Sequence, residues 1–300
     1  MSEQALTFSC RGAELVGILH RAEQPGTVGV VVVVGGGPQY RVGGHRQLVL
    51  WSRRLAQAGY PVLRFDYRGM GDSGGEFPTF EHVDDDIQAA VDRLCAEQPG
   101  LRQVVLWGEC DGASAIVYYA WRDRRVGGVV LLNPWARTEA LRAKAVLRHY
   151  YLKRLLEPSF WKKLVSLRLN PLDSLRSIWR VWRSSRQSLR AVAADGPAAG
   201  DLSAPLSRDL PLPERLLAGW QRFGGRIMLV MSGRDLIARE FDELIKGSPP
   251  WQAAIEAAEL TRHDLPDGDH TFSSAAMRGQ VIDWALDWLP AQAGAREPRP

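Results

Sequence analysis

The 300-residue sequence contains only three cysteines, Cys10, Cys95 and Cys110. They lie far apart, are odd in number and have no metal-site spacing, so neither a disulfide framework nor a zinc site is indicated. We therefore expect no metal ion and no other cofactor. Such sparse cysteine usage fits a reducing compartment.

The sequence also has no long apolar run. No stretch approaches 18 uninterrupted apolar residues, and the first ten residues, MSEQALTFSC, lack a basic start followed by an apolar segment. We therefore expect a soluble, cytoplasmic protein. Because 45% of the residues are hydrophobic, one large α/β core with an insertion is predicted and disorder is not.

Acidic residues are scarce in one part of the chain. Residues 137–190 contain 14 Lys or Arg but only three acids, a net charge of +11, so the rest carries −7 within the total of +4. This segregation marks a boundary and indicates an anionic partner. The alternative interpretation is a set of amphipathic helices whose basic face is simply solvated.

Strands and helices alternate over most of the chain. The seven residues Val28–Val34 are all valine or glycine, which predicts a strand buried on both faces, as in a parallel sheet. A hairpin precedes this strand. Further strands are predicted at 61–66, from Val104 up to the glycine at 108, and at 126–133, 226–231 and 259–264.

Helical spacing falls between these strands. Residues 47–59, 80–97, 237–246 and 273–289 fit helices, and Thr79 is the predicted N-cap of the second. We predict an α/β core at 1–133 and 220–290, an inserted helical basic cap at 134–219 and a flexible tail at 291–300. The core is a mostly parallel sheet with helices on both faces.

A candidate nucleophile lies in the stretch VVLWGECDGASA, residues 104–115. An apolar strand ends at Gly-x-Cys-x-Gly and small residues follow, which predicts a strand, a sharp turn and a helix with Cys110 at the apex. A glycine on each side avoids a Cβ clash in this turn. An ordinary buried cysteine at a strand–helix junction is the alternative interpretation.

An acid and a histidine follow in the chain order that such a nucleophile requires. Asp235 comes directly after the predicted strand 226–231, and His270 precedes the last helix. Asp267 and Asp269 are rival acids, but they are too close to His270 in one loop to reach its far nitrogen. His45, after the glycine-rich loop, is a further candidate for the lining of the site.

Backbone N–H groups of Asp111, Gly36 and Gly37 are the predicted oxyanion hole. Asp111 follows the nucleophile, whereas Gly36 and Gly37 follow the valine strand. No Lys-Ser or Lys-Thr comes after the glycines, which argues against a nucleotide P-loop. Glu109 and Asp111 flank Cys110, and their charge favours the neutral thiol. We therefore expect Cys110 to react by transferring its proton to His270.

These motifs resemble the α/β-hydrolase superfamily over residues 5–133 and 220–290. More narrowly, VGGGPQYRVGGHRQ at 34–47, the GECDG elbow and the basic cap resemble the exosortase A system-associated hydrolase 1 family. That resemblance implies a hydrolase of unknown substrate encoded with bacterial exopolysaccharide genes. Cysteine replaces the usual serine, as it does in dienelactone hydrolases and polyhydroxyalkanoate synthases.

The sequence therefore predicts an esterase or thioesterase that forms an acyl-cysteine, with Cys110 as nucleophile, His270 as base and Asp235 as orienting acid. Two alternatives stay open, an acyltransferase with the same intermediate and a catalytically silent scaffold of the polysaccharide machinery. The expected partner is a small or carrier-linked acyl substrate, with an anionic group if the basic cap recruits it. Nucleic acid is not expected, and peripheral membrane contact through the cap is a further hypothesis.

Overall fold

The fold was analysed in a computed structural model that describes residues 1–35, 40–136 and 210–290. Within these residues one sheet has the strand order β1-β2-β4-β3-β5-β6-β7-β8. The strands are β1 (Ser2–Cys10), β2 (Ala13–Arg21), β3 (Val28–Val33), β4 (Val62–Phe65), β5 (Gln103–Glu109), β6 (Val126–Leu132), β7 (Arg226–Ser232) and β8 (Leu260–Leu265). The predicted α/β architecture is confirmed.

The sheet is antiparallel only at one edge. β1 and β2 form the predicted hairpin, and β2 also pairs antiparallel with β4. All strand pairs from β4 through β8 are parallel. The carboxyl ends of β3, β5, β6, β7 and β8 consequently lie at the same end of the sheet, which is where ligands bind in open α/β sheets.

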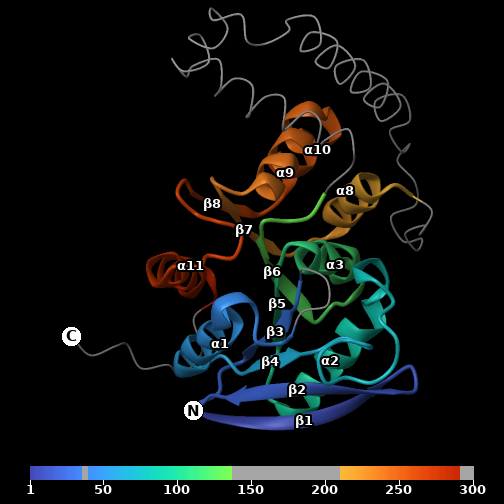
Figure 1. Cartoon of the computed structure of the whole chain (residues 1–300), viewed down its shortest axis with the longest axis vertical. Coiled ribbons are helices and arrows are strands. Elements are labelled where there is room, and N and C mark those ends of the chain that lie inside the picture. The colour runs from blue at the N-terminus through green and yellow to red at the C-terminus, as the bar shows by residue number, and fades with distance from the viewer. Residues whose placement is uncertain (36–39, 137–209, 291–300) are drawn as a thin grey trace, which may run out of the picture.

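Helices cover both faces of the sheet (Figure 1). The α-helices are α1 (Gln47–Gln57), α2 (Asp84–Glu97), α3 (Asp111–Tyr119), α8 (Leu212–Arg222), α9 (Leu236–Gly247), α10 (Pro249–Ala257) and α11 (Ala275–Trp288). Helices α1 and α11 lie on one face, whereas α2, α3 and α8 lie on the other. No described helix is both long and apolar enough to cross a membrane.

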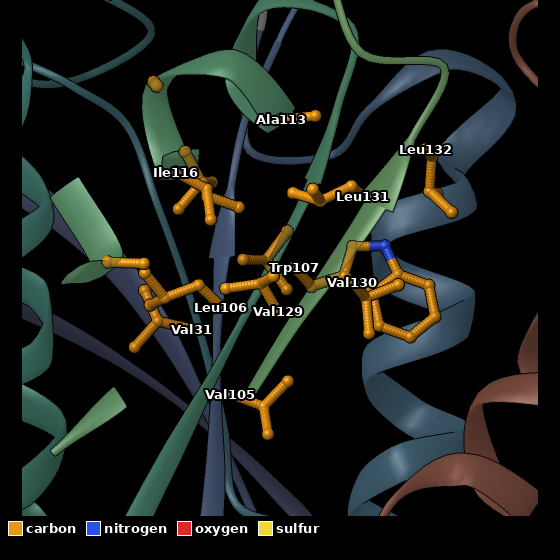
Figure 2. Packing of buried hydrophobic residues seen from close by; sticks show 14 of the residues in the cluster. Val31, Val105, Leu106, Trp107, Ala113, Ile116, Val129, Val130, Leu131 and Leu132 are labelled. Carbon is orange, nitrogen blue, oxygen red and sulfur yellow. The ribbon is translucent and has the colours of Figure 1, made fainter. Parts of the chain in front are cut away.

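The central strands supply side chains to both layers. Figure 2 shows Leu106 of β5 beside Val31 and Ile116, toward α3, and Trp107 on the opposite face, toward α1. The Trp107 ring lies 5.3 Å from the ring of Trp51 in α1, measured between centroids. Burial on both faces explains why these strands read as continuous apolar runs rather than alternating ones.

The helix predicted over residues 80–97 differs from the observed structure. A short 3-10 helix, Phe80–His82, comes first, and α2 begins separately at Asp84. Thr79 has a φ of 68° and makes no side-chain cap hydrogen bond, so the predicted N-cap is wrong. Asp84, Asp85 and Asp86 occupy the first turn of α2, where negative charge is favourable, and each also pairs with an arginine of another segment.

Two helices were not predicted. Helix α10 begins with Pro249 and Pro250, a placement that suits a first turn because those positions need no N–H donor. Helix α8 spans the boundary predicted at residues 219 and 220, and its Trp220 packs 5.8 Å from Trp251 of α10. Residues 137–209, the bulk of the predicted cap, and the tail 291–300 lie outside the described residues.

Two acidic residues at the start of α2 differ in burial and should differ in their contribution to stability. Asp86 is fully buried and accepts hydrogen bonds from the backbone and the guanidinium of Arg68, the shortest at 2.7 Å. Asp86→Ala should lower the free energy of unfolding by roughly 3 kcal/mol, because it leaves Arg68 without its partner.

The neighbouring Asp85 provides a matched control, since it pairs with Arg11 at 2.9 Å on the surface. Asp85→Ala should cost less than about 1 kcal/mol. Urea unfolding of both variants measures the difference. Equal losses would show that the Arg68–Asp86 pair does not hold the loop after β4 to α2.

Candidate active site

Cys110 lies at the apex of a strained turn between β5 and α3. Its φ of 57° and ψ of −126° belong to a region that non-glycine residues rarely adopt. Backbone hydrogen bonds on both sides hold this conformation, from Cys110 N–H to the Leu132 carbonyl at 2.9 Å and from Trp135 N–H to the Cys110 carbonyl at 3.1 Å. The predicted elbow is therefore present.

The flanking glycines avoid Cβ clashes at the turn, as predicted. Neither Gly108 nor Gly112 has a positive φ, because the cysteine itself takes the strained conformation. A Cβ on Gly112 would lie 2.7 Å from the Val33 carbonyl oxygen, and one on Gly108 would lie 2.8 Å from the Gly112 carbonyl carbon. Glycine is required here so that β3, β5 and α3 can approach closely.

The thiol of Cys110 contacts two groups that favour its ionised form. The His270 side chain and the backbone N–H of Asp111 are both hydrogen-bonded to it. Burial nevertheless dominates and raises the pKa of Cys110, with a further contribution from the Asp111 carboxylate. Both effects favour the neutral thiol of Cys110.

His270 is placed between Cys110 and Asp235. Its Nδ1 lies 2.8 Å from Oδ2 of Asp235, which leaves Nε2 for the thiol. Burial opposes the charged imidazolium, but the hydrogen bonds to Asp235 and Cys110 outweigh it and raise the pKa of His270 to about 10. The geometry joins the three predicted residues in one chain of hydrogen bonds.

Asp235 also caps α9. Its Oδ1 accepts a hydrogen bond from Ile237 N–H at 3.1 Å, and its Oδ2 accepts one from Ala238 N–H at 3.3 Å. The helix holds the carboxylate in one orientation, and the carboxylate in turn orients the imidazole. Asp235 is therefore both the cap of α9 and the partner of His270.

The rival acids have other partners. Asp269 accepts hydrogen bonds from the backbone and hydroxyl of Ser273, and Asp267 pairs with Arg234 at 2.5 Å. Burial opposes the charge of Asp269, but the Ser273 hydrogen bonds, with a smaller contribution from nearby His45, lower its pKa. His45 therefore lies close to the loop that carries His270.

Asn133, which the sequence analysis did not single out, links three elements of the site. This fully buried residue has a φ of 46°. Its Nδ2 donates to Ser232 Oγ at 2.9 Å and to the His270 carbonyl at 3.1 Å, while its Oδ1 accepts from Ser232 N–H at 2.8 Å. A polar residue between an apolar strand and Pro134 is the sequence signal for such a bridge.

A second pair missed at the sequence level involves Glu109, the residue that directly precedes Cys110. Gln47 Nε2, at the start of α1, donates a hydrogen bond to Glu109 Oε2, at the end of β5. Burial is the main cause that raises the pKa of Glu109 to about 8. The two residues are 62 positions apart, so no local pattern could have indicated their contact.

Only part of the predicted oxyanion hole is described. The N–H of Asp111 points to the sulfur of Cys110, whereas Gly36 and Gly37 lie outside the described residues. The preceding residue, Gly35, is pressed against the elbow, since a Cβ there would lie 2.0 Å from the Glu109 carbonyl oxygen. Among the described residues, no group of three His, Cys, Asp or Glu side chains could hold a metal ion.

The family is established by its sequence model. Residues 29–262 match the Hydrolase_4 family, described as serine aminopeptidase S33, and the chain belongs to this family. It has the α/β-hydrolase fold. No curated protein sequence matches the chain. At the elbow, this chain carries Cys110 where the family description names serine.

Solved structures share the fold at low sequence identity. The esterase Pf2001 of Pyrococcus furiosus is 16% identical with a TM-score of 0.59, over 96% of this chain and 94% of that one. A thermostable carboxyl esterase from Bacillus coagulans is 14% identical with a TM-score of 0.60, over 96% and 98%. The Butyrivibrio proteoclasticus protein Est1E with bound ferulic acid is 16% identical with a TM-score of 0.54, over 95% and 97%.

The two roles of Asp235 can be separated by substitution. The pKa of His270 is raised in the folded protein, so its stabilising contribution is complete below about pH 6.5 and is lost as the pH rises toward about 10. Asp235→Asn removes the charge but keeps a capping oxygen. Its free energy of unfolding should fall furthest below wild type near pH 6, and the gap should narrow toward pH 10.

Asp235→Ala serves as the comparison because it also removes the cap. It should lose about 1 kcal/mol more than Asp235→Asn at every pH. Urea unfolding between pH 6 and 10 measures both effects. A gap between wild type and Asp235→Asn that does not change with pH would mean that Asp235 acts only as a helix cap.

Proposed function

We propose that this protein is a hydrolase that cleaves an ester or thioester through an acyl-cysteine intermediate. The observation that carries the proposal is the hydrogen-bonded chain from Cys110 through His270 to Asp235 at the carboxyl ends of β5, β7 and β8. A nucleophile, a base and an orienting acid in this arrangement define a catalytic triad. Membership of the Hydrolase_4 family supports this class of reaction.

The first half-reaction forms the thioester. This step requires the neutral imidazole of His270, whose fraction grows as the pH rises toward about 10. Nε2 of the neutral ring takes the thiol proton while the sulfur of Cys110 attacks the carbonyl carbon of the substrate. The Asp111 N–H donates to the negative oxygen of the tetrahedral intermediate. As this intermediate collapses, His270 returns the proton to the leaving oxygen or sulfur, and the acyl group stays on Cys110.

The second half-reaction consumes water. His270 takes a proton from water as the water oxygen attacks the acyl-cysteine carbonyl, and the carbon–sulfur bond breaks with return of that proton to sulfur. Asp235 keeps its negative charge throughout and stabilises the imidazolium. The products are a carboxylic acid and the free thiol of Cys110.

Acyl trapping tests the nucleophile. With a p-nitrophenyl ester, wild type should release a burst of nitrophenol and gain the mass of one acyl group, located on Cys110 by peptide mass spectrometry. Cys110→Ala should show no acyl adduct and at least a roughly thousandfold lower kcat/KM, and His270→Ala a similar loss. The losses should not add in the double variant.

Cys95→Ala is the control, since Cys95 is a more exposed thiol on α2, outside the triad. It should acylate and turn over like wild type. Near-normal turnover by Cys110→Ala would overturn the proposed nucleophile. An acyl adduct that survives in water but is released by a hydroxyl compound would identify the acyltransferase, and complete inertness the scaffold.

The substrate should carry a negative charge if the basic segment 137–190 recruits it. The net charge of +11 in this segment supports an anionic substrate. The resemblance of residues 34–47 and the elbow to the exosortase A system-associated hydrolase 1 family is a second support. An acidic glycan ester, a lipid-linked sugar phosphate or a carrier-bound acyl group has the required charge. This resemblance also supports a role beside bacterial exopolysaccharide synthesis or export in the cytoplasm.

Salt dependence tests the charge. Raising salt from about 50 to 500 mM should raise KM for an acidic ester and leave kcat nearly unchanged, because screening weakens long-range attraction only. Lys162→Glu combined with Lys163→Glu should act like high salt, whereas neutral esters should show neither effect. A KM insensitive to both would exclude electrostatic recruitment, and co-sedimentation with anionic vesicles would then test membrane contact.

A further inference from the structure

The head groups of Gln47 and Glu109 form a buried pair with two unused oxygens. One hydrogen bond joins Nε2 of Gln47 to Oε2 of Glu109. Oε1 of Gln47 and Oε1 of Glu109 are both shielded from solvent, and neither has a hydrogen-bond partner among the residues that the structure describes. Two buried acceptors without a donor are costly and call for an explanation.

One proton on Glu109 would give both unpaired oxygens a hydrogen bond. A carboxylic acid and a primary amide form a two-bond ring, in which the amide N–H donates to one acid oxygen and the acid O–H donates to the amide oxygen. The existing hydrogen bond supplies the first half of this ring. A proton on Glu109 Oε1 would supply the second half.

We propose that Glu109 is a neutral carboxylic acid paired with Gln47, and that this proton tunes the reactivity of Cys110 by keeping a negative charge away from its sulfur. Glu109 is thus a positioning residue rather than one that touches the substrate. The inference rests on the proposed role of Cys110 as nucleophile, which Glu109 directly precedes in the chain.

The charges that face Glu109 favour the neutral form. Burial raises its pKa to about 8, against the opposing effect of His270, and Asp235, Asp269 and Asp111 each raise it further. Three carboxylates and one imidazolium thus surround this group. An additional negative charge on Glu109 would oppose formation of the thiolate at Cys110.

Ionisation of Glu109 should lower the reactivity of the Cys110 thiol at alkaline pH. Below about pH 8 the acid is neutral, and the thiol meets no charge from this side chain. Above it, the residue that precedes Cys110 adds a negative charge among His270, Asp235 and Asp111, and thiolate formation becomes less favourable. Glu109→Gln has a side chain of similar shape that is neutral at every pH, so the loss of Cys110 reactivity above about pH 8 should disappear in this variant.

Infrared difference spectroscopy tests the proton directly. The spectrum of wild type minus Glu109→Gln should contain a protonated carboxyl band at pH 6 that disappears with a midpoint near pH 8. Glu256→Gln, an exposed residue of α10, is the control and should lack such a band. An ionised Glu109 at pH 6 would overturn the proposal.

Alkylation tests the effect on the thiol independently of turnover. The rate of Cys110 modification by iodoacetamide, followed by peptide mass spectrometry, should be within about twofold for wild type and Glu109→Gln at pH 6.5. At pH 9 the variant should react about tenfold faster, since one nearby charge shifts a pKa by about one unit. Glu256→Gln should follow wild type.

The outcomes distinguish the two proposals. Parallel wild-type and Glu109→Gln profiles at all pH values would refute the tuning role even if acyl trapping succeeds. Failure of acyl trapping with divergent profiles would remove the hydrolase proposal and leave the neutral Glu109. If Cys110 resists alkylation at every pH in both proteins, the tuning role is refuted and the infrared titration decides the protonation state.

Discussion

The close approach of β3, β5 and α3 is the constraint on which the candidate site depends. Gly112 lies against the Val33 carbonyl, so the helix begins directly over the end of a neighbouring strand. The chain can make this turn only if one residue takes a strained conformation, and that residue is Cys110. The same sharp turn strains the backbone of Cys110 and directs its thiol toward His270.

Loops from three further strands meet the elbow at the same edge of the sheet. Asn133 after β6 joins the end of β7 to the His270 loop through three hydrogen bonds of 2.8 to 3.1 Å. Asp235 is fixed by the first turn of α9. Asn133 and Asp235 are therefore held by backbone as well as by side-chain hydrogen bonds, which limits the motion that would separate His270 from Cys110.

The surroundings of the Cys110 thiol have opposing effects on its ionisation. Burial opposes the charge of Cys110, while His270 and the Asp111 N–H favour it. The buried Glu109 would tip this balance if it were ionised. Its pairing with Gln47 therefore connects the first residue of α1 to the end of β5, directly before the proposed nucleophile Cys110.

The sequence by itself determined the sheet, most helices and the order nucleophile, acid, histidine, because these depend on local periodicity and on motifs within a few residues. The cap predicted at Thr79 was wrong, and the contact of Asp235 with α9 as well as with His270 could not be found from the sequence. Tertiary structure decided these points, since Thr79 takes a positive φ and the Asp235 carboxylate has room for both partners. The Asn133 bridge and the Gln47–Glu109 pair join residues far apart in the chain, and only folding brings such groups within hydrogen-bonding distance.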